Sequence, residues 1–393
     1  MTPTSSITTE NSAPPPSGGA SAAIPVNDLA RSYQPRRVWA AGISIGWNLL
    51  LAVLFVFTGA GERLYKHFVP QDPAYFPPSF AWIAPVYFSI LFAGYALLNF
   101  PLELWFGYLE ERQFGLAKDG VRAWARDWLI GTTQHGVMFL IGCCLLLVFQ
   151  LIAPHTWLVW SAGTLLILFL GTTWLAADLI PLGLFTLERA DAATVARLTR
   201  LSGPLPPVVV YSHSGLREFA GGIVGLGSRQ VMLVSRATVE LASDTLLRFV
   251  LLHDLGHRRY HHNLLAALAG WAWVVIGLAV GDHVIPARWG HDTAVFGSPL
   301  YVAFLTLILS AWMAIGEPVL AYLGRRLEYQ ADRFYLRNGG TLDQMRAALD
   351  QLAHQNLART EAMRRRETIF HPLPSVYNRL YAARQYQERT QGA

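Results

Sequence analysis

Charged residues are scarce in this sequence. Only 15% of the 393 residues are Asp, Glu, Lys or Arg, whereas 53% are apolar, and the mean hydropathy is +0.31. Soluble globular domains carry about 25% charged residues, so this composition excludes an ordinary soluble protein. We therefore expect the chain to be a membrane protein.

Three further absences exclude other classes. No basic residue precedes Arg31, and the N-terminal stretch rich in Ser, Pro and Gly has no apolar core, so we expect no secretory signal but a disordered cytoplasmic tail over residues 1–37. The net charge of +5 is not gathered into a basic patch with interleaved aromatics, so we expect no nucleic-acid partner. The only two cysteines, Cys143 and Cys144, are neighbours inside an apolar segment, and we interpret them as apolar packing residues.

Apolar segments of spanning length recur along the chain. Each holds roughly 18 or more residues, enough to cross about 30 Å of hydrocarbon. A further stretch, Leu179–Leu187, is too short to span and is interpreted as an interfacial extension. We predict six membrane-spanning helices in contact with the lipid bilayer, over Val38–Thr58, Phe80–Leu102, Gly136–Ala153, Thr156–Ala177, Leu264–Gly281 and Ser298–Gly316.

The basic residues predict how these spans are oriented. Arginines gather before the first span, between the second and third, between the fourth and fifth, and after the sixth, whereas the loop between the third and fourth spans has no Lys or Arg. Positive charge marks the cytoplasmic side, so both termini are expected there; the loop with Arg63 and Lys66 is the one exception. Only two of the 31 basic residues are lysines, a bias that favours a GC-rich bacterial genome and hence an inner membrane.

Two polar segments, residues 188–263 and 325–393, are predicted to form a small α+β domain on the cytoplasmic side. Residues 264–324 carry the last two spans between these halves, and residues 38–187 carry the first four. The fold class is therefore mainly α: a polytopic helical membrane protein with a small α+β domain.

Within the first half, two β-branched runs predict strands at Pro207–Tyr211 and Gln230–Ser235, as a hairpin or as two edge strands. The glycine-rich Phe219–Gly227 between them is interpreted as a turn. A helix is predicted over Ser243–Asn263, with Ser243 or Asp244 as its N-cap, and we expect it to continue without interruption into the fifth span.

A candidate metal site lies on this predicted helix. His253 and His257 are four residues apart, so both imidazoles lie on one face and can converge on one ion. The helix of the sixth span is expected to continue through Arg325 to Phe334, interrupted only by Pro318. The carboxylate of Glu328 on it would complete three ligands with the fourth position open. That is the layout of a zinc hydrolase. Asp332, one turn further, would orient a ligand histidine or a polar group near the substrate.

Other polar residues near these motifs have alternative interpretations. Asp254 stands where zinc proteases of this spacing carry Glu as general base; we predict that it takes this role, and a purely structural helix residue is the alternative. His261 and His262 continue the run of histidines and are expected to be solvated or interfacial. Glu317 either points into a polar interior or marks the end of its span at the headgroups.

Taken together, these motifs resemble the type I CAAX prenyl protease family of membrane-embedded zinc metalloendopeptidases, over nearly all of Val38–Tyr381. The resemblance implies a helical barrel around a large water-filled chamber, closed on the cytoplasmic side by the zinc domain. It also implies one Zn²⁺ per chain, held by His253, His257 and Glu328, with Asp332 as a catalytic helper. The segments that carry the likeness are P-L-E-L-W from Pro101, E-E-R-Q-F-G-L from Glu110, H-D-x-x-H from His253, E-Y-Q-A-D from Glu328 and P-S-V-Y-N-R from Pro374.

The sequence departs from the family pattern at three places. Asp254 replaces a glutamate, the nearest histidine to the C-terminal signature is His371 rather than the residue directly before Pro374, and the stretch around Phe219–Gly222 lacks the asparagine expected at the start of a substrate-pairing strand. These changes affect catalytic and substrate-binding positions and leave the metal ligands in place.

Two hypotheses of different classes follow. In the first, the protein is a zinc endopeptidase acting on peptides or proteins, including membrane-associated or prenylated ones. Asp254 would be its general base, and His371 or Arg379 would stabilise the oxyanion. In the second, it is a zinc-binding pseudoprotease that serves as a membrane binding chamber or chaperone. A transporter is a weaker third alternative, because no inverted repeat is visible.

Overall fold

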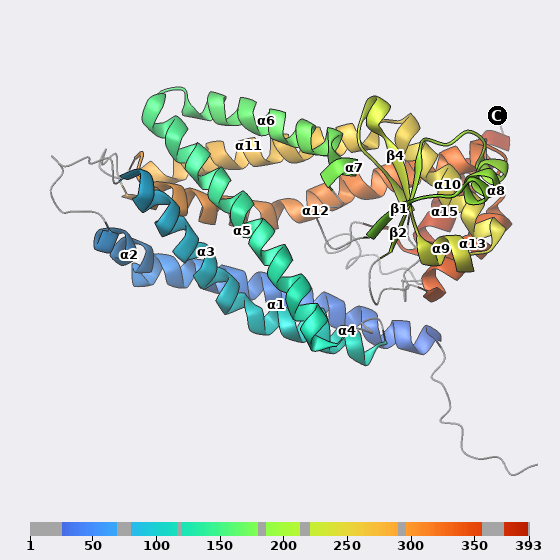
Figure 1. Ribbon diagram of the computed structural model, residues 1–393, viewed down its shortest axis with the longest axis horizontal. Helices are drawn as coiled ribbons and strands as arrows, with labels where there is room; N and C mark the ends of the chain where they lie inside the picture. The colour runs from blue at the N-terminus through green and yellow to red at the C-terminus, as the bar shows by residue number, and fades with distance from the viewer. Residues whose placement is uncertain are drawn as a thin grey trace, which may run out of the picture.

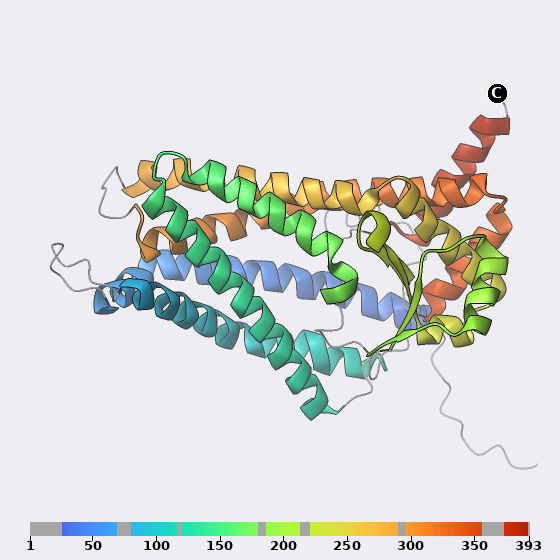
Figure 2. The same cartoon turned by 45° about the horizontal axis from the view of Figure 1, so that its top comes forward.

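The computed structural model describes residues 26–68, 80–115, 120–179, 186–212, 221–289, 296–355 and 373–391. Long helices extend along the longest axis of the molecule, and a small domain of strands and shorter helices lies at one end of them (Figure 1). A view turned by 45° shows the same arrangement, with the small domain built from two separate parts of the chain (Figure 2).

Among the residues that the structure describes, six helices are long and apolar enough to cross a membrane, as the sequence predicted. Large apolar side chains such as Trp82, Leu97 and Ile167 are exposed on them, as lipid-facing positions require. Shorter elements connect them: α2 (Ala60–Phe68), a π-helical turn at Trp105–Leu109, α4 (Glu110–Gln113) and α7 (Ala176–Leu179). The six long helices are α1 (Val26–Thr58), α3 (Phe80–Leu104), α5 (Val121–Ile152), α6 (Trp157–Trp174), α11 (His262–Trp289) and α12 (Pro299–Arg337).

The first helix begins earlier than we predicted. Residues 26–37, assigned to the tail, are part of α1, while residues 1–25 lie outside the described residues. A tertiary contact explains the difference: Tyr33 is buried, and its hydroxyl donates a hydrogen bond of 2.6 Å to Glu111 Oε1 on α4. Packing against a distant helix therefore extends α1 beyond the apolar run that marks its span.

Helices α11 and α12 pack closely along the membrane part. The rings of Trp273 and Trp312 stack with centroids 4.7 Å apart, and each indole N–H donates to the backbone carbonyl of the other tryptophan. Glycines make room for this contact, since a Cβ at Gly316 would overlap Trp273 and one at Gly277 would overlap Trp312. Small residues opposite large ones hold the two helices in register.

The small domain contains a four-stranded sheet in the order β1-β2-β4-β3. Its strands are β1 (Thr186–Arg189), β2 (Val208–Ser212), β3 (Gly221–Val224) and β4 (Val231–Ser235). Both predicted arrangements of these two strands are wrong. β2 and β4 pair in parallel and not as a hairpin, and they are the inner strands of the sheet, because β1 and β3 pair antiparallel on their outer sides and form the edges.

The glycine-rich segment is likewise only in part a turn. Gly221 and Gly222 belong to strand β3, whereas Gly225 and Gly227 have positive φ angles of 89° and 57° and reverse the chain before β4. Such angles favour glycine, so the turn is confined to these two positions.

Among the described residues, five helices belong to the same domain as this sheet: α8 (Ala192–Ser202), α9 (Arg236–Leu241), α10 (Asp244–Arg259), α13 (Leu342–Gln355) and α15 (Val376–Gln391). Leu247 and Leu251 of α10 are fully buried in the domain core, together with Met232 of β4 and Leu349 of α13. Ser243 is the N-cap of α10, and its hydroxyl accepts a hydrogen bond from the backbone N–H of Leu246. The core thus fixes α10 as the central helix of the domain.

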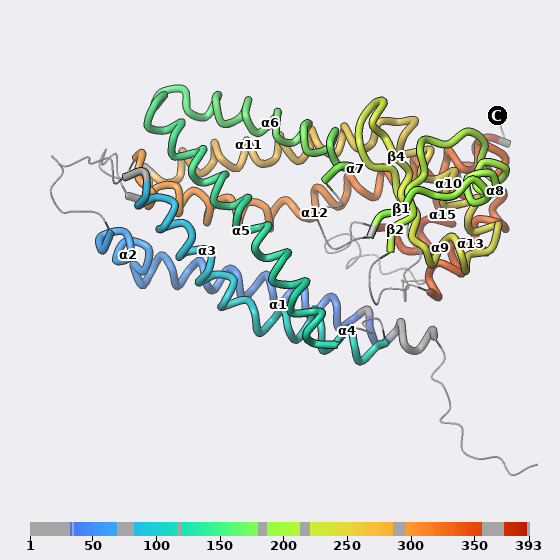
Figure 3. The backbone as a smooth tube through the Cα atoms, in the orientation of Figure 1, coloured from blue at the N-terminus to red at the C-terminus, as the bar shows by residue number. Residues whose placement is uncertain are grey.

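A break separates α10 from the fifth membrane helix, although we expected one continuous helix. The chain leaves α10 after Arg259 and starts α11 at His262, and its path can be followed in Figure 3. His261 has a φ of 54°, the only positive φ of a non-glycine residue in the described part of the chain. The side-chain amide of Asn263 donates to the Ile223 carbonyl at 2.8 Å, so the start of α11 is tied to strand β3. This hydrogen bond sets the direction of α11, which differs from a straight continuation of α10.

Candidate metal centre

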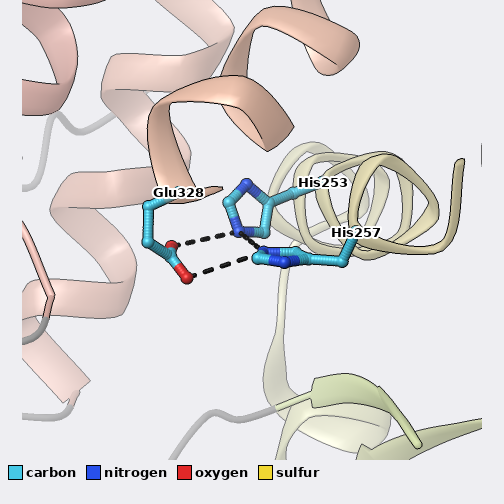
Figure 4. Close-up of side chains that lie close together, drawn as sticks. All are labelled: His253, His257 and Glu328. Atoms are coloured by element: carbon cyan, nitrogen blue, oxygen red, sulfur yellow. Dashed lines mark hydrogen bonds and ion pairs between the residues drawn. The ribbon is translucent and has the colours of Figure 1, made fainter. Parts of the chain in front are cut away.

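Helices α10 and α12 meet where the two predicted metal motifs lie. His253 and His257 project from α10 toward Glu328 on α12 (Figure 4). In the part of the chain that the structure describes, these three side chains form the one group of His, Cys, Asp or Glu residues that could hold a metal ion, with one ligand atom from each within 4.8 Å of the others. The structure therefore brings together the residues that the sequence singled out.

The distances between these atoms suit a tetrahedral metal ion. The two Nε2 atoms of His253 and His257 are 3.1 Å apart, and they lie 3.2 Å and 3.5 Å, respectively, from the two carboxylate oxygens of Glu328. Ligand atoms about 2.0–2.2 Å from a tetrahedral zinc ion lie roughly 3.3–3.6 Å from each other. Two imidazoles and a carboxylate at this spacing fit zinc and leave one coordination position open.

A glycine allows the two helices to approach this closely. A Cβ at Gly256 would lie 3.0 Å from the Ala331 Cα and 3.0 Å from the Phe334 Cβ. Gly256 is buried directly before His257, and Ala331 lies between Glu328 and Asp332 on α12. The two backbones are thus in contact beside the candidate ligands. This close approach lets the side chains of the two histidines and Glu328 meet.

The other ring nitrogen of His253 contacts a buried ion pair. Its Nδ1 lies 3.0 Å from Asp332 Oδ1, and Arg379 on α15 donates to both oxygens of Asp332, at 2.9 Å from Nε and 2.5 Å from Nη2. The Arg379 guanidinium also packs over the Phe249 ring at 5.3 Å. A carboxylate on Nδ1 keeps the proton there, so Nε2 offers its lone pair toward the metal position.

Asp254 directly follows His253 on α10 and is buried. Its Oδ2 has no hydrogen-bond partner among the described residues, and a Cβ at Gly221 of strand β3 would lie 3.1 Å from this oxygen. Burial raises the pKa of Asp254 to about 7. A carboxylate with an unpaired oxygen and a pKa near neutrality can accept and return a proton.

The pKa values of His253 and His257 are shifted in opposite directions. Burial would lower the pKa of His253, but its interactions with Asp332 and Glu328 raise it to about 9. Burial, followed by the charge of His253, lowers the pKa of His257 to about 4. Several displaced pKa values within one buried cluster are typical of a functional site.

One member of the cluster differs from the expectation. His262 was expected to be solvated or interfacial; it is not solvated, because the residue is buried and its Nδ1 lies 2.9 Å from Nδ1 of His257. His261 is exposed, as expected. No local signal distinguishes the two histidines, because the break in the helix decides which of them faces inward. Of the other candidates, Glu317 is exposed on α12, and His371 lies outside the described residues.

Comparisons with known proteins agree with this architecture. The sequence pattern of peptidase family M48 matches residues 189–387, and that of the CAAX prenyl protease N-terminal region, described as five membrane helices, matches residues 11–182. Four of the six long apolar helices lie in the latter range, among the residues that the structure describes.

Similarity of fold extends over most of the chain. The crystal structure of S. mikatae Ste24p superposes with a TM-score of 0.75 at 17% sequence identity, covering 91% of this chain and 88% of that chain. No curated protein matches the sequence. The membrane helices and the small domain thus recur together in a solved structure.

Proposed function

The chain belongs to peptidase family M48, and from this premise we propose that it is a zinc-dependent membrane endopeptidase with His253, His257 and Glu328 as ligands of one zinc ion. The observation that carries the proposal is the convergence of their donor atoms at 3.1–3.5 Å from one another. When bound, zinc supplies a Lewis acid that polarises the scissile carbonyl and makes a water molecule acidic at neutral pH.

Asp254 is the proposed general base. Its buried Oδ2 takes the proton of the attacking water and later returns it to the leaving amine. Aspartate is one methylene, about 1.5 Å, shorter than glutamate, and a misplacement of about 1 Å can lower the rate on the order of 10²-fold. We therefore expect slow turnover rather than none.

Strand β3 is the proposed docking edge for the substrate. It pairs with β4 on one side, while no strand of the described residues pairs with its other side. An extended peptide can add to such an edge through its backbone hydrogen bonds. Gly221 on this strand lies against Asp254, so a peptide bound here would pass the proposed base. We propose peptides or proteins as substrates, including membrane-associated or prenylated ones.

Two further residues have proposed roles. Asp332 orients His253, and Arg379 holds Asp332, since both oxygens of this carboxylate accept hydrogen bonds from the arginine. This position favours Arg379 as a residue that acts through Asp332 over one that contacts the oxyanion directly. His371 stays the candidate for oxyanion stabilisation.

Zinc content and peptide cleavage, measured on the full chain purified in detergent, test this proposal. We expect one zinc per chain, together with slow cleavage of an unfolded or prenylated peptide that stops when a chelator removes the metal and resumes on adding zinc. A chain without zinc would overturn the proposal. One observation favours a second function, a zinc-binding pseudoprotease: the shortened base at Asp254. Zinc without turnover on any peptide supports that alternative.

We further propose that the site faces the cytoplasm of a bacterium, with the protein in the inner membrane. The arginines that flank the spans support this orientation. Reporter fusions after Ala153 should then report an extracytoplasmic position, and fusions after Arg259 and Arg379 a cytoplasmic one. A cytoplasmic signal at Ala153 would contradict the six-span orientation.

A further inference from the structure

The break before the fifth membrane helix brings His262 into contact with His257, which a straight helix would not do. In a continuous helix, residues five apart are rotated by roughly 140° from each other, so the side chains of His257 and His262 would diverge. The positive φ of 54° at His261 redirects the chain, and the two rings instead meet with centroids 4.8 Å apart and nearly perpendicular planes. An unusual backbone angle directly beside a functional cluster points to a role for the residue that it reorients.

The hydrogen bonds around His262 form a chain with one consistent direction. His257 can offer Nε2 to a metal only if its proton is on Nδ1, which then donates to Nδ1 of His262 across 2.9 Å. The proton of His262 must therefore be on Nε2, and this atom lies 3.3 Å from the side-chain oxygen of Gln330 on α12. Each of the two rings then has one N–H donor and one free nitrogen: His257 donates to His262 and His262 donates to Gln330, while Nε2 of His257 stays free for the metal.

Contacts with three residues hold the His262 ring in this position. Besides the hydrogen bonds to His257 and Gln330, the ring of Tyr260 stacks on it at 5.8 Å with an interplanar angle of 24°, and the residue is 2% exposed. Gln330 lies two residues after Glu328 on the same helix. The hydrogen-bonded chain thus starts at one proposed ligand histidine on α10 and ends on α12, the helix that carries the third proposed ligand.

We propose that His262, held by Gln330, is a positioning residue that fixes the tautomer and the ring orientation of His257 toward the metal. The inference rests on the proposed zinc site. The two proposed ligand histidines then have different hydrogen-bond partners. His253 contacts the charged pair of Asp332 and Arg379, whereas His257 contacts the neutral imidazole of His262, which is held by the Gln330 amide. Outer partners of metal-bound histidines typically contribute 10–100-fold to metal affinity.

The test is the zinc dissociation constant of the purified full chain, measured by competition with a coloured chelator. His262→Phe keeps a ring of similar size but removes the acceptor, and we expect it to weaken zinc binding on the order of 10–100-fold. His262→Asn places an amide oxygen near the position of Nδ1 and should restore most of the affinity. Gln330→Leu should cause a smaller loss, because His262 remains. His261→Asn is the matched control, since this neighbour is exposed and asparagine tolerates a positive φ.

The visible spectrum of the cobalt-substituted protein gives a second readout. It reports the ligand geometry, so His262→Phe should shift the cobalt absorption bands while His261→Asn leaves them unchanged. Parent-like zinc affinity in His262→Phe would overturn the inference, and so would equal losses in His262→Phe and His262→Asn, because restoring a hydrogen-bond acceptor would then make no difference. If His262→Phe does not fold, the zinc affinities of His262→Asn and Gln330→Leu decide. Near-parent affinity in His262→Asn with a loss in Gln330→Leu supports the inference, and parent-like affinity in Gln330→Leu with a loss in His262→Asn contradicts it. Absence of zinc from the parent chain would instead remove the proposed function itself.

Discussion

The two helices that carry the predicted ligands are anchored in different ways. Helix α10 has 16 residues, begins at the Ser243 cap, lies in the core of the small domain and ends before the membrane part. Helix α12 has 39 residues and runs without interruption from the membrane part to Arg337. The histidines thus belong to the small domain, and Glu328 belongs to a helix shared with the membrane part. Helix α12 also reaches the core of the small domain, where its Tyr335 is buried against Phe249 of α10. The site therefore lies where one helix joins the two regions.

The largest effect is expected from the ligands, and it should be the same for both helices. Replacement of His253, His257 or Glu328 by Ala should remove zinc and abolish cleavage, because three ligands leave no redundancy. Metal analysis of the purified variants checks this. Retention of one zinc per chain in His257→Ala, with His261 or His262 as a substitute ligand, would show that the assignment is wrong.

Asp254 should affect turnover while the zinc remains. Asp254→Ala should abolish cleavage, and Asp254→Glu should raise it by up to 10²-fold, equivalent to about 2.7 kcal/mol of barrier. Rates of peptide cleavage and zinc content, measured on the same samples, separate the base from the ligands. Cleavage by Asp254→Ala at the rate of the parent would exclude this residue as the base. An active parent with an inactive Asp254→Glu would mean that the geometry of the site suits the shorter carboxylate of aspartate and not that of glutamate.

The contact between the two helices can be tested at Gly256. An added methyl would meet the α12 backbone at Ala331, which cannot turn away as a side chain can, so Gly256→Ala should separate the helices. We expect a loss of about 1–3 kcal/mol in stability, together with weaker zinc binding. Thermal unfolding and zinc affinity measure the two effects.

A matched control is Gly163→Ala on α6, where an added Cβ meets nothing within 4 Å. This variant should be neutral or slightly stabilising, because alanine is a better helix former than glycine. Equal losses from the two variants would show that the helix contact at Gly256 has no special importance.

The smallest effect is expected where the two regions touch at the surface. Arg229 of the small domain pairs with Asp178 on α7 at 2.5 Å and lies over the Trp174 ring, but both members of the ion pair are substantially exposed. Arg229→Ala should cost no more than about 1 kcal/mol and leave the zinc affinity unchanged. A large loss of metal in this variant would mean that the peripheral contact, rather than the helix crossing, aligns the two regions.

The sequence predicted those features that depend on local pattern. Six apolar runs gave six membrane helices, and the spacing of His253 and His257 placed both on one face of α10. Features that depend on distant contacts were missed. The parallel pairing of β2 with β4 requires β3 on the far side, and nothing in the two strands themselves encodes that order.

The helix break illustrates the same limit at the site itself. Tyr260 and His261 include neither glycine nor proline, so the pattern favours a continuous helix. The bond from Asn263 to the Ile223 carbonyl fixes the new direction, and it exists only once the sheet has formed. His262 therefore became recognisable as part of the site only from the folded structure, whereas Asp332 could be predicted from its position one turn after Glu328.

The separation of the ligands along the chain has a consequence for biosynthesis. His253 and His257 leave the ribosome before α11 and the membrane part of α12, and Glu328 leaves it only afterwards. The site can be completed only when these two helices have been inserted and returned the chain to the side from which it came. A nascent chain arrested between them would carry the histidine pair without its carboxylate. Binding of the proposed zinc ion would thus be a late event, and stable zinc retention would mark chains whose insertion is finished.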